Sequence, residues 1–350
     1  MNKVFKVVYS KSKGCYVVVP ETAKNNNGKK KVLASVLAGL ALVGGAVAGT
    51  PVDAYNSANP RTADSGSINT DGSRINIAAH AKPANRVGVN SIVVGYQNTT
   101  DDNDGTTALG ANNQAYGNSG LAVGNQNESR GGASTAIGAG NRAAGAATVA
   151  IGNVSNANAK SAIAIGSYNN VDYTKGTWQT APKNAGEYST VVGNYSSATG
   201  TSASAMGVYT NATGAGSFAA GYNNNAKGQN SVAIGSENTS HVADTVTLGQ
   251  FNNAKTMGGI SIGKNNLTDS ADGNRGDVER NKENSQIAIG RDNTATNLDA
   301  IAIGRDTHAT GSGATALGAR ADASGNNSIA IGQSGKTSDR VVASGVNSIA

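Results

Sequence analysis

The sequence has 350 residues, of which 47 are glycine, 5 are proline and 4 % are aromatic. This composition argues against an ordinary globular enzyme and is typical of a repeat structure built from small side chains. The formal net charge of +6 comes from residues 1–48, which hold eight lysines and one glutamate, whereas the rest holds twenty basic and twenty-one acidic residues, so no nucleic-acid partner is expected.

Residues 1–48 have the features of an extended signal peptide. Lysines at 29–31 precede an apolar run, 32–48, and small residues suited to cleavage lie near residue 48 and residue 54. We expect a helical secretory signal peptide, because no stop-transfer segment comes after it. Glycines in and after the run disfavour the alternative, a single membrane anchor. Cys15, the only cysteine, lies in this leader, so packing and oligomerisation rather than disulfides must stabilise the exported protein.

Residues 49–84 are polar and contain three prolines, at positions 51, 60 and 83. Such a stretch predicts a flexible N-terminal segment or, at most, a cap on the repeats that begin at residue 85. Within it, Ile75-Asn76-Ile77 fits a degenerate first strand.

From residue 85 to residue 350 the chain repeats one short motif. Aligned on their closing glycine, the sixteen copies end at Gly95, Gly110, Gly124, Gly138, Gly152, Gly166, Gly193, Gly207, Gly221, Gly235, Gly249, Gly263, Gly290, Gly304, Gly318 and Gly332. Twelve of the fifteen intervals are 14 residues, one is 15 and two are 27. A fixed period over this length indicates a stacked repeat architecture.

The residues before each closing glycine predict a strand. The preceding residue is large and aliphatic in fifteen of the sixteen copies, and the residue two places earlier is mostly Ile, Val, Leu or Phe. These two positions share one face of a strand, and we expect that face to be buried inside the coil. Alanine stands between them in twelve copies, as at Ala164, Ala233 and Ala302. We expect this alanine face to pack against another copy of the same chain.

A weaker segment lies half a period earlier, as in Asn225-Ala226-Lys227-Gly228. The position seven before the closing glycine is glycine in ten copies, and we expect a positive φ there. Each period therefore predicts one coil of strand, turn, strand and turn, with coils stacked about 4.8 Å apart. The recurrent glycine and the lack of a 3.6-residue stripe exclude a helical repeat.

Two 13-residue insertions interrupt the array and are expected to leave it as loops. The first, within 167–189, contains Trp178, the only tryptophan, for which ligand anchoring and packing against a neighbouring subunit both stay open. The second, within 264–286, is rich in charge. The sequence ends at Ala350 inside a motif, without a heptad stalk or an amphipathic barrel segment, so we expect an N-terminal fragment lacking stalk and membrane anchor.

No constellation of residues predicts an active site. His80, His241 and His308 lie in different coils without a His or Cys partner at ligand spacing, so no metal site is expected. The segment 138–143 superficially resembles a dinucleotide fingerprint but belongs to the repeat, and the acidic cluster 101–104 favours a solvated turn over a cation site. We expect no cofactor and no enzyme activity. The remaining enzymatic interpretation, a carbohydrate-active β-helix, lacks stacked carboxylates along the coils.

Two stretches resemble a known family. MNKVFKVVYSKSKGCYVVVPE looks like the extended signal-peptide region of large Gram-negative autotransporters. The stretch Asn230-Ser231-Val232-Ala233-Ile234-Gly235-Ser236 matches the NSVAIG-S motif of YadA-like heads residue for residue. Over residues 85–350 the chain therefore resembles the head of the trimeric autotransporter adhesins. The resemblance implies an all-β fold, a homotrimer of left-handed parallel β-rolls exported through the inner membrane and displayed on the outer membrane.

The resemblance also implies adhesion to extracellular matrix proteins such as collagen, or to other cell-surface ligands. The tentative ligand-binding residues are Asn230 to Ser236, Asn327 and Ser328 of a close variant motif, and Trp178. A structural interpretation competes with this one, because periodicity alone explains Val232, Ile234 and Gly235. The alternative function is self-association in biofilms without a specific host ligand, and a cell-aggregation assay would separate the two.

Overall fold

The computed structural model describes residues 5–10, 15–20, 67–69, 75–78, 90–100, 105–170, 185–269, 285–333 and 339–350. It divides into two units, Met1–Ser57 and Ala58–Ala350. The apolar run 32–48, both expected cleavage sites, the acidic cluster 101–104, His80 and Trp178 lie outside the described residues. Within the described residues, no helix has the length and apolar character needed to cross a membrane.

The described part of unit Met1–Ser57 is a β-hairpin. Strands β1 (Phe5–Ser10) and β2 (Cys15–Pro20) pair antiparallel, with Phe5 opposite Pro20. Both strands are rich in valine and tyrosine, the residue types that favour a pleated backbone. The helix expected for the signal peptide belongs to the run 32–48, so the structure neither supports nor opposes it.

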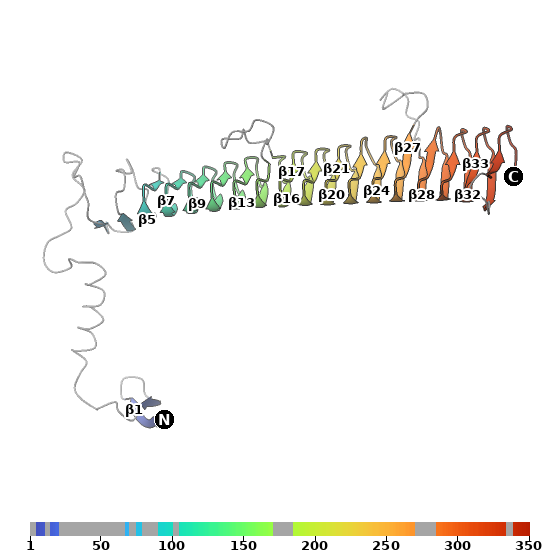
Figure 1. Cartoon of the computed structure of the whole chain (residues 1–350). Helices are drawn as coiled ribbons and strands as arrows, with labels where there is room; N and C mark the ends of the chain where they lie inside the picture. Colours follow the sequence, from blue (N-terminus) through green and yellow to red (C-terminus); the bar gives the residue numbers. More distant parts are fainter. Residues whose placement is uncertain are drawn as a thin grey trace. The chain divides into compact units, whose positions relative to one another are not determined.

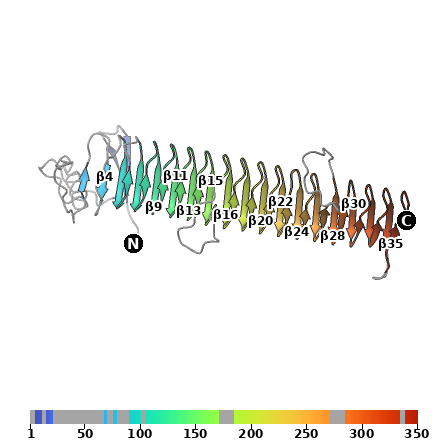
Figure 2. The ribbon, with the colours of Figure 1, turned by 90° about the horizontal axis from the view of Figure 1, so that it is seen from above.

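Unit Ala58–Ala350 is a row of coils, each seen edge-on in Figure 1 and from a perpendicular direction in Figure 2. It begins with a hairpin of β3 (Ser67–Asn69) and β4 (Ile75–Ala78). Strand β4 then pairs parallel with β5 (Ile92–Tyr96), with Ile75 opposite Ile92. The strand expected at Ile75-Asn76-Ile77 is therefore confirmed.

Each coil contributes one five-residue strand to a long parallel sheet. These strands are β5, β7 (Thr107–Ala111), β9 (Leu121–Asn125), β11 (Thr135–Ala139), β13 (Val149–Asn153), β15 (Ile163–Ser167), β16 (Thr190–Asn194), β18 (Ser204–Val208), β20 (Phe218–Tyr222), β22 (Val232–Ser236), β24 (Val246–Gln250), β26 (Ile260–Lys264), β28 (Ile287–Arg291), β30 (Ile301–Arg305), β32 (Thr315–Ala319) and β34 (Ile329–Gln333). Neighbours pair in strict register, so that Gly235 lies opposite Gly249 and the closing glycines form one column.

The other half of each coil contributes a strand of two or three residues. Five of these form one sheet: β6 (Thr99–Thr100), β8 (Gln114–Ala115), β10 (Glu128–Ser129), β12 (Arg142–Ala143) and β14 (Asn156–Ala157). Ten form a second: β17 (Ser197–Ala198), β19 (Asn211–Ala212), β21 (Asn225–Ala226), β23 (Thr239–Ser240), β25 (Asn253–Ala254), β27 (Leu267–Asp269), β29 (Thr294–Thr296), β31 (His308–Ala309), β33 (Ala321–Ala323) and β35 (Val341–Ala343). The predicted coil of strand, turn, strand and turn is thus confirmed.

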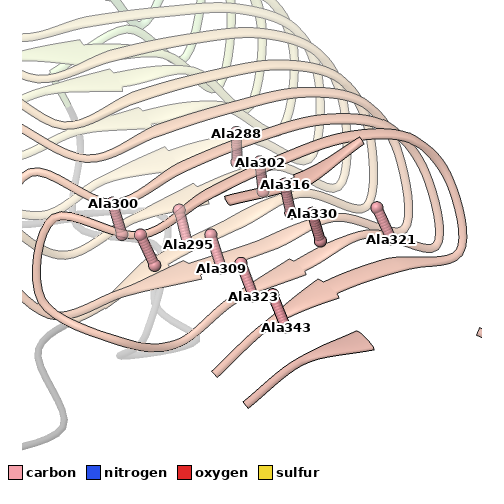
Figure 3. Packing of buried hydrophobic residues seen from close by; sticks show 11 residues of the cluster. Ala288, Ala295, Ala300, Ala302, Ala309, Ala316, Ala321, Ala323, Ala330 and Ala343 are labelled. Carbon is pink, nitrogen blue, oxygen red and sulfur yellow. The ribbon is translucent and has the colours of Figure 1, made fainter. Parts of the chain in front are cut away.

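The interior of the coil is filled by alanine, which corrects the expectation that the aliphatic residues lie inside. Ala233 of the long strand and Ala226 of the short strand are both 0 % exposed, whereas Ile234 is 37 % exposed. Figure 3 shows the same arrangement near the C-terminal end, where alanines of the long strands face alanines of the short strands. A coil of 14 residues has a narrow interior that admits small side chains, with valine at Val93 and Val191 in the same column, so the larger side chains point outward.

The glycine seven residues before the closing glycine also has a different role from the expected one. Gly228 does not have a positive φ, but a Cβ on it would lie 1.8 Å from the carbonyl oxygen of Val242 in the next coil. Close approach of two backbones therefore excludes a side chain there. The left-handed residue of this turn is Asn230, two places later, with a φ of 52°.

Neither insertion adds a coil to the long sheet. Strand β15 pairs directly with β16, and β26 pairs directly with β28, across the two 27-residue intervals. Among the described residues after β15, Asn170 takes the place of a short strand. The Asn170 amide donates to the carbonyl of Asn156 (2.9 Å), and its Oδ1 accepts from the backbone N–H of Ala198 (2.9 Å).

Candidate binding surface

The motif at residues 230–236 spans one turn and one long strand, and only alternate residues reach the surface. Asn230, Val232, Ile234 and Ser236 are exposed or half-buried, whereas Ser231 and Ala233 are fully buried. The strand alternates because successive side chains point to opposite faces of the sheet. The surface that this motif offers to a ligand is therefore limited to four side chains.

The buried residues of the motif hold the coil together. The Ser231 hydroxyl donates to the carbonyl of Gly228 (2.7 Å) and fastens the preceding turn. Gly235 has a φ of 122°, and a Cβ on it would lie 2.0 Å from the carbonyl oxygen of Gly249. The recurrence of these residues is explained by folding alone.

Asn327 and Ser328, the second predicted pair, divide between the surface and the interior in the same way. Asn327 is exposed, has a φ of 55°, and bonds through its backbone N–H to the carbonyl of Ser312 (2.8 Å). Ser328 is fully buried and offers nothing to a ligand. The structure therefore places Asn230 and Asn327 at equivalent corners of different coils, before β22 and β34, along the same edge.

A ladder of buried asparagines, which the sequence interpretation missed, supports the corner after ten of the closing glycines. Its members stand three residues after that glycine: Asn98, Asn113, Asn127, Asn141, Asn169, Asn224, Asn238, Asn252, Asn266 and Asn293. The Asn238 amide donates to the carbonyls of Ile234 (2.9 Å) and Gly249 (2.7 Å). Its Oδ1 accepts from the backbone N–H and side-chain amide of Asn252, both at 3.0 Å. The ten recurrences are visible in the sequence and could have revealed the ladder.

The outer face of the long sheet carries an aliphatic stripe. It consists of the outward residues one and three places before each closing glycine, such as Ile234 and Val232, and we call it the aliphatic face. Exposure of its residues in the single chain reaches 57 % at Ile331. A continuous apolar surface of this kind marks a contact with another protein surface. The aliphatic face therefore takes the place of the alanine face as the surface expected to meet a second copy.

The outer face of the short strands is polar, and we call it the polar face. Glu128 lies between two arginines, with Arg142 Nε 3.1 Å from Glu128 Oε2 and Arg130 on the other carboxylate oxygen. Further along, Lys255 Nζ lies 2.8 Å from Asp269 Oδ2. Glu128–Arg142 and Lys255–Asp269 each join neighbouring coils, so the polar face carries both signs of charge close together.

The residues considered for chemistry are not brought together. His241 and His308 lie in different coils, and His308 has two carboxylates nearby, with Nε2 3.8 Å from Asp306 and Nδ1 4.0 Å from Asp322. Within the described ranges no three His, Cys, Asp or Glu side chains are placed so that they could hold a metal ion together. The segment 138–143 forms the end of β11, a turn and β12, and no helix comes directly after it.

The sequence matches two families. Residues 1–49 match the extended signal peptide of the type V secretion system. The YadA head domain repeat matches at residues 87–113, 102–127, 185–210, 212–238, 287–307 and 309–334. No curated protein matches the chain. The head-repeat matches fall on the coils described above.

Proposed function

Because the chain is the head of a trimeric autotransporter adhesin, we propose that it attaches the cell to extracellular matrix through weak contacts repeated along three chains. The type V signal and the YadA head make it a surface-exposed protein of the outer membrane. The head is a non-enzymatic trimer of left-handed β-rolls. Matrix proteins such as collagen are the ligands that we propose.

The observation that supports this proposal is the separation of two outer faces on each coil. The aliphatic face is the surface suited to bury against sister chains, since exposed stripes of this size are unfavourable in water. The polar face then points outward and repeats at every coil. Contacts that are weak at one coil add up along the row and across three chains.

Replacing Ile234 with serine tests the aliphatic face. Removal of a buried isoleucine side chain is worth about 2–3 kcal/mol for each chain. We expect the exported trimer to melt at a lower temperature and to dissociate at a higher concentration, measured by calorimetry and light scattering. Thr239→Ser on the polar face is the control, because serine occupies the same column at Ser197. Equal stability of both variants would rule out the aliphatic face as the chain contact.

Replacing the exposed motif residues tests their part in ligand binding. Asn230→Gly and Asn327→Gly remove the side chain without backbone strain, since Gly216 and Gly313 occupy the same corner with φ of 65° and 67°. If these corners contact the matrix, the double variant binds collagen-coated surfaces about tenfold more weakly, with an unchanged melting temperature. Unchanged binding of the double variant would remove the motif corners from the ligand surface.

The same preparations decide between matrix adhesion and self-association. Binding of the exported trimer to collagen, laminin and fibronectin is measured on coated surfaces, and aggregation of cells that display it is measured in suspension. Adhesion predicts saturable binding to at least one matrix protein. Aggregation without any matrix binding would replace the proposal with self-association.

A further inference from the structure

The corner after each long strand has a left-handed backbone in every described coil, two residues after the closing glycine. Asparagine fits this conformation readily, as at Asn223. Three successive coils instead have a tyrosine there: Tyr168, Tyr195 and Tyr209, with φ of 54°, 53° and 56°. A side chain of this kind in the left-handed region costs about 1–2 kcal/mol. Other coils meet the same cost without stacked rings, as at Val154 and Arg320, with φ of 52° and 59°.

At the tyrosines, ring stacking offsets part of that cost. Tyr168 and Tyr195 stack with centroids 4.9 Å apart and planes 3° apart, and Tyr195 and Tyr209 stack at 5.3 Å and 15°. Tyr222 meets Tyr209 edge-on at 6.2 Å. Such pairs contribute about 0.5–1.5 kcal/mol each. Stacking does not explain why the last two rings remain accessible to solvent: Tyr209 is 46 % and Tyr222 is 51 % exposed.

The exposed side chains of Val208, Tyr209 and Tyr222 and the half-buried ring of Tyr195 form one group, which we call the aromatic corner. Val208 lies opposite Tyr222 in the register of β18 and β20, whose positions can be followed from the labels β16 and β20 in Figure 1. In the other coils the residue directly after the closing glycine, which is the position of Val208, is mostly polar or small. Exposed apolar groups gathered in one place on a soluble surface indicate a binding site.

The rim of the aromatic corner is polar. Asn194 and Ser236 are the register neighbours of Val208 and Tyr222, and Asn223 is the next residue after Tyr209 in the corner column. The side-chain amides of Asn194 and Asn223 have no hydrogen-bond partner within the described residues. Glu237 follows Asn223 in the corner column, and its backbone N–H donates to the carbonyl of Tyr222 (2.9 Å). The site thus combines aromatic rings and free amides with one carboxylate residue at its edge.

We propose that the aromatic corner binds a neutral saccharide chain. A sugar ring has an apolar face of C–H groups, which packs on an aromatic ring, and hydroxyls at its edge, which bond to amides. The Glu237 carboxylate disfavours an anionic ligand, whereas the hydroxyls of a neutral sugar can donate hydrogen bonds to it and can also bond to the amides. The inference rests on the proposed adhesive function and names a second ligand class for it. The trimer carries three such corners, so weak binding at one is multiplied.

The test uses the exported trimer and neutral tetrasaccharides of glucose, galactose and N-acetylglucosamine, with binding followed by saturation-transfer NMR. Tyr209→Asn and Tyr222→Ser copy residues that the chain itself uses in these columns, Asn223 and Ser236. Loss of an aromatic anchor is expected to weaken binding about tenfold in either variant. Phe251→Asn is the matched control, because Phe251 stands at the same kind of corner, is 42 % exposed and lies beyond the stacked column.

The expected result is binding of at least one tetrasaccharide that is lost in both tyrosine variants, retained in Phe251→Asn, and accompanied by an unchanged trimer melting temperature. No binding of any tetrasaccharide overturns the inference. So does a lower melting temperature in the tyrosine variants, which would make the corner a contact between chains. Loss of collagen binding with sugar binding absent would assign the corner to a protein ligand. Matrix binding is measured on the same variants, so failure of the adhesive proposal is seen separately.

Discussion

Replacement of Asn238 by alanine is expected to unfold its coil and the two neighbouring coils locally. In this variant the carbonyl of Gly249 and the N–H groups of Asn252 lose the hydrogen bonds that the buried Asn238 side chain makes to them. Each such group costs about 1–3 kcal/mol when buried without a partner. The total loss is about 3–5 kcal/mol on the same scale, and hydrogen exchange followed by mass spectrometry should show lost protection across β22 to β24.

Asn238→Ser is the matched comparison, because serine stands in the ladder at Ser155. There the hydroxyl donates to the carbonyl of Gly166 (3.1 Å), and the backbone N–H still bonds to Oδ1 of Asn141 (2.9 Å). Serine therefore restores one of the lost bonds, and we expect its exchange protection to fall between that of the native chain and Asn238→Ala. Equal protection in the alanine and native chains would show that the ladder contributes little to stability.

Replacement of Gly235 by alanine is expected to have an equal or larger effect. The added Cβ would lie 2.0 Å from the carbonyl oxygen and 2.9 Å from the carbonyl carbon of Gly249, both in the backbone of the next coil. The φ of 122° is also unfavourable for any side chain. The coils must separate to admit the methyl group, at a cost of about 4 kcal/mol or more. Calorimetry of the exported trimer should show a lower melting temperature.

Gly132→Ala provides the control for this variant. The nearest atom to its added Cβ is the carbonyl oxygen of Asn118, at 4.0 Å, and alanine occupies the same place one coil later, at Ala146. Its melting temperature should match that of the native chain. If both glycine variants melted alike, close packing of the closing-glycine column would not be a determinant of the fold.

The period, the strand before each closing glycine and the parallel stacking were all predictable from the sequence. Regular spacing fixes the register between neighbouring strands, because a shift of one residue would move Ala233 from the inner to the outer face of the sheet. The sequence interpretation did not show correctly which side chains lie inside the coil and which lie outside it. Ile234 was expected inside because large apolar residues usually fill cores. A second column of small residues, which includes Ala226, could have shown this, because two facing columns of small residues define a narrow interior.

The candidate site was predicted less well than the fold. Asn230 and Asn327 were identified and do lie at the surface, but Ser231, Ala233 and Ser328 are buried. The motif was selected for its recurrence, and recurrence in a repeat protein reports folding constraints first. The aromatic corner could not be found in that way, because its tyrosines depart from the repeat rather than conform to it. The common place of three of them, two residues after a closing glycine, was visible in the sequence. Only the folded coil shows that their rings stack and that Tyr209 and Tyr222 stay exposed.

The bridge made by Asn170 has a consequence for the evolution of this surface. A single side chain joins Asn156 to Ala198 and takes the place of a short strand, while β15 and β16 stay paired on the opposite wall. Two bonds of one amide therefore connect the short-strand sheet that ends at β14 to the short-strand sheet that begins at β17. A substitution at Asn170 would separate these two sheets while the long sheet stays continuous. Selection against change is therefore expected to be stronger at this one buried amide than at exposed positions of the neighbouring coils.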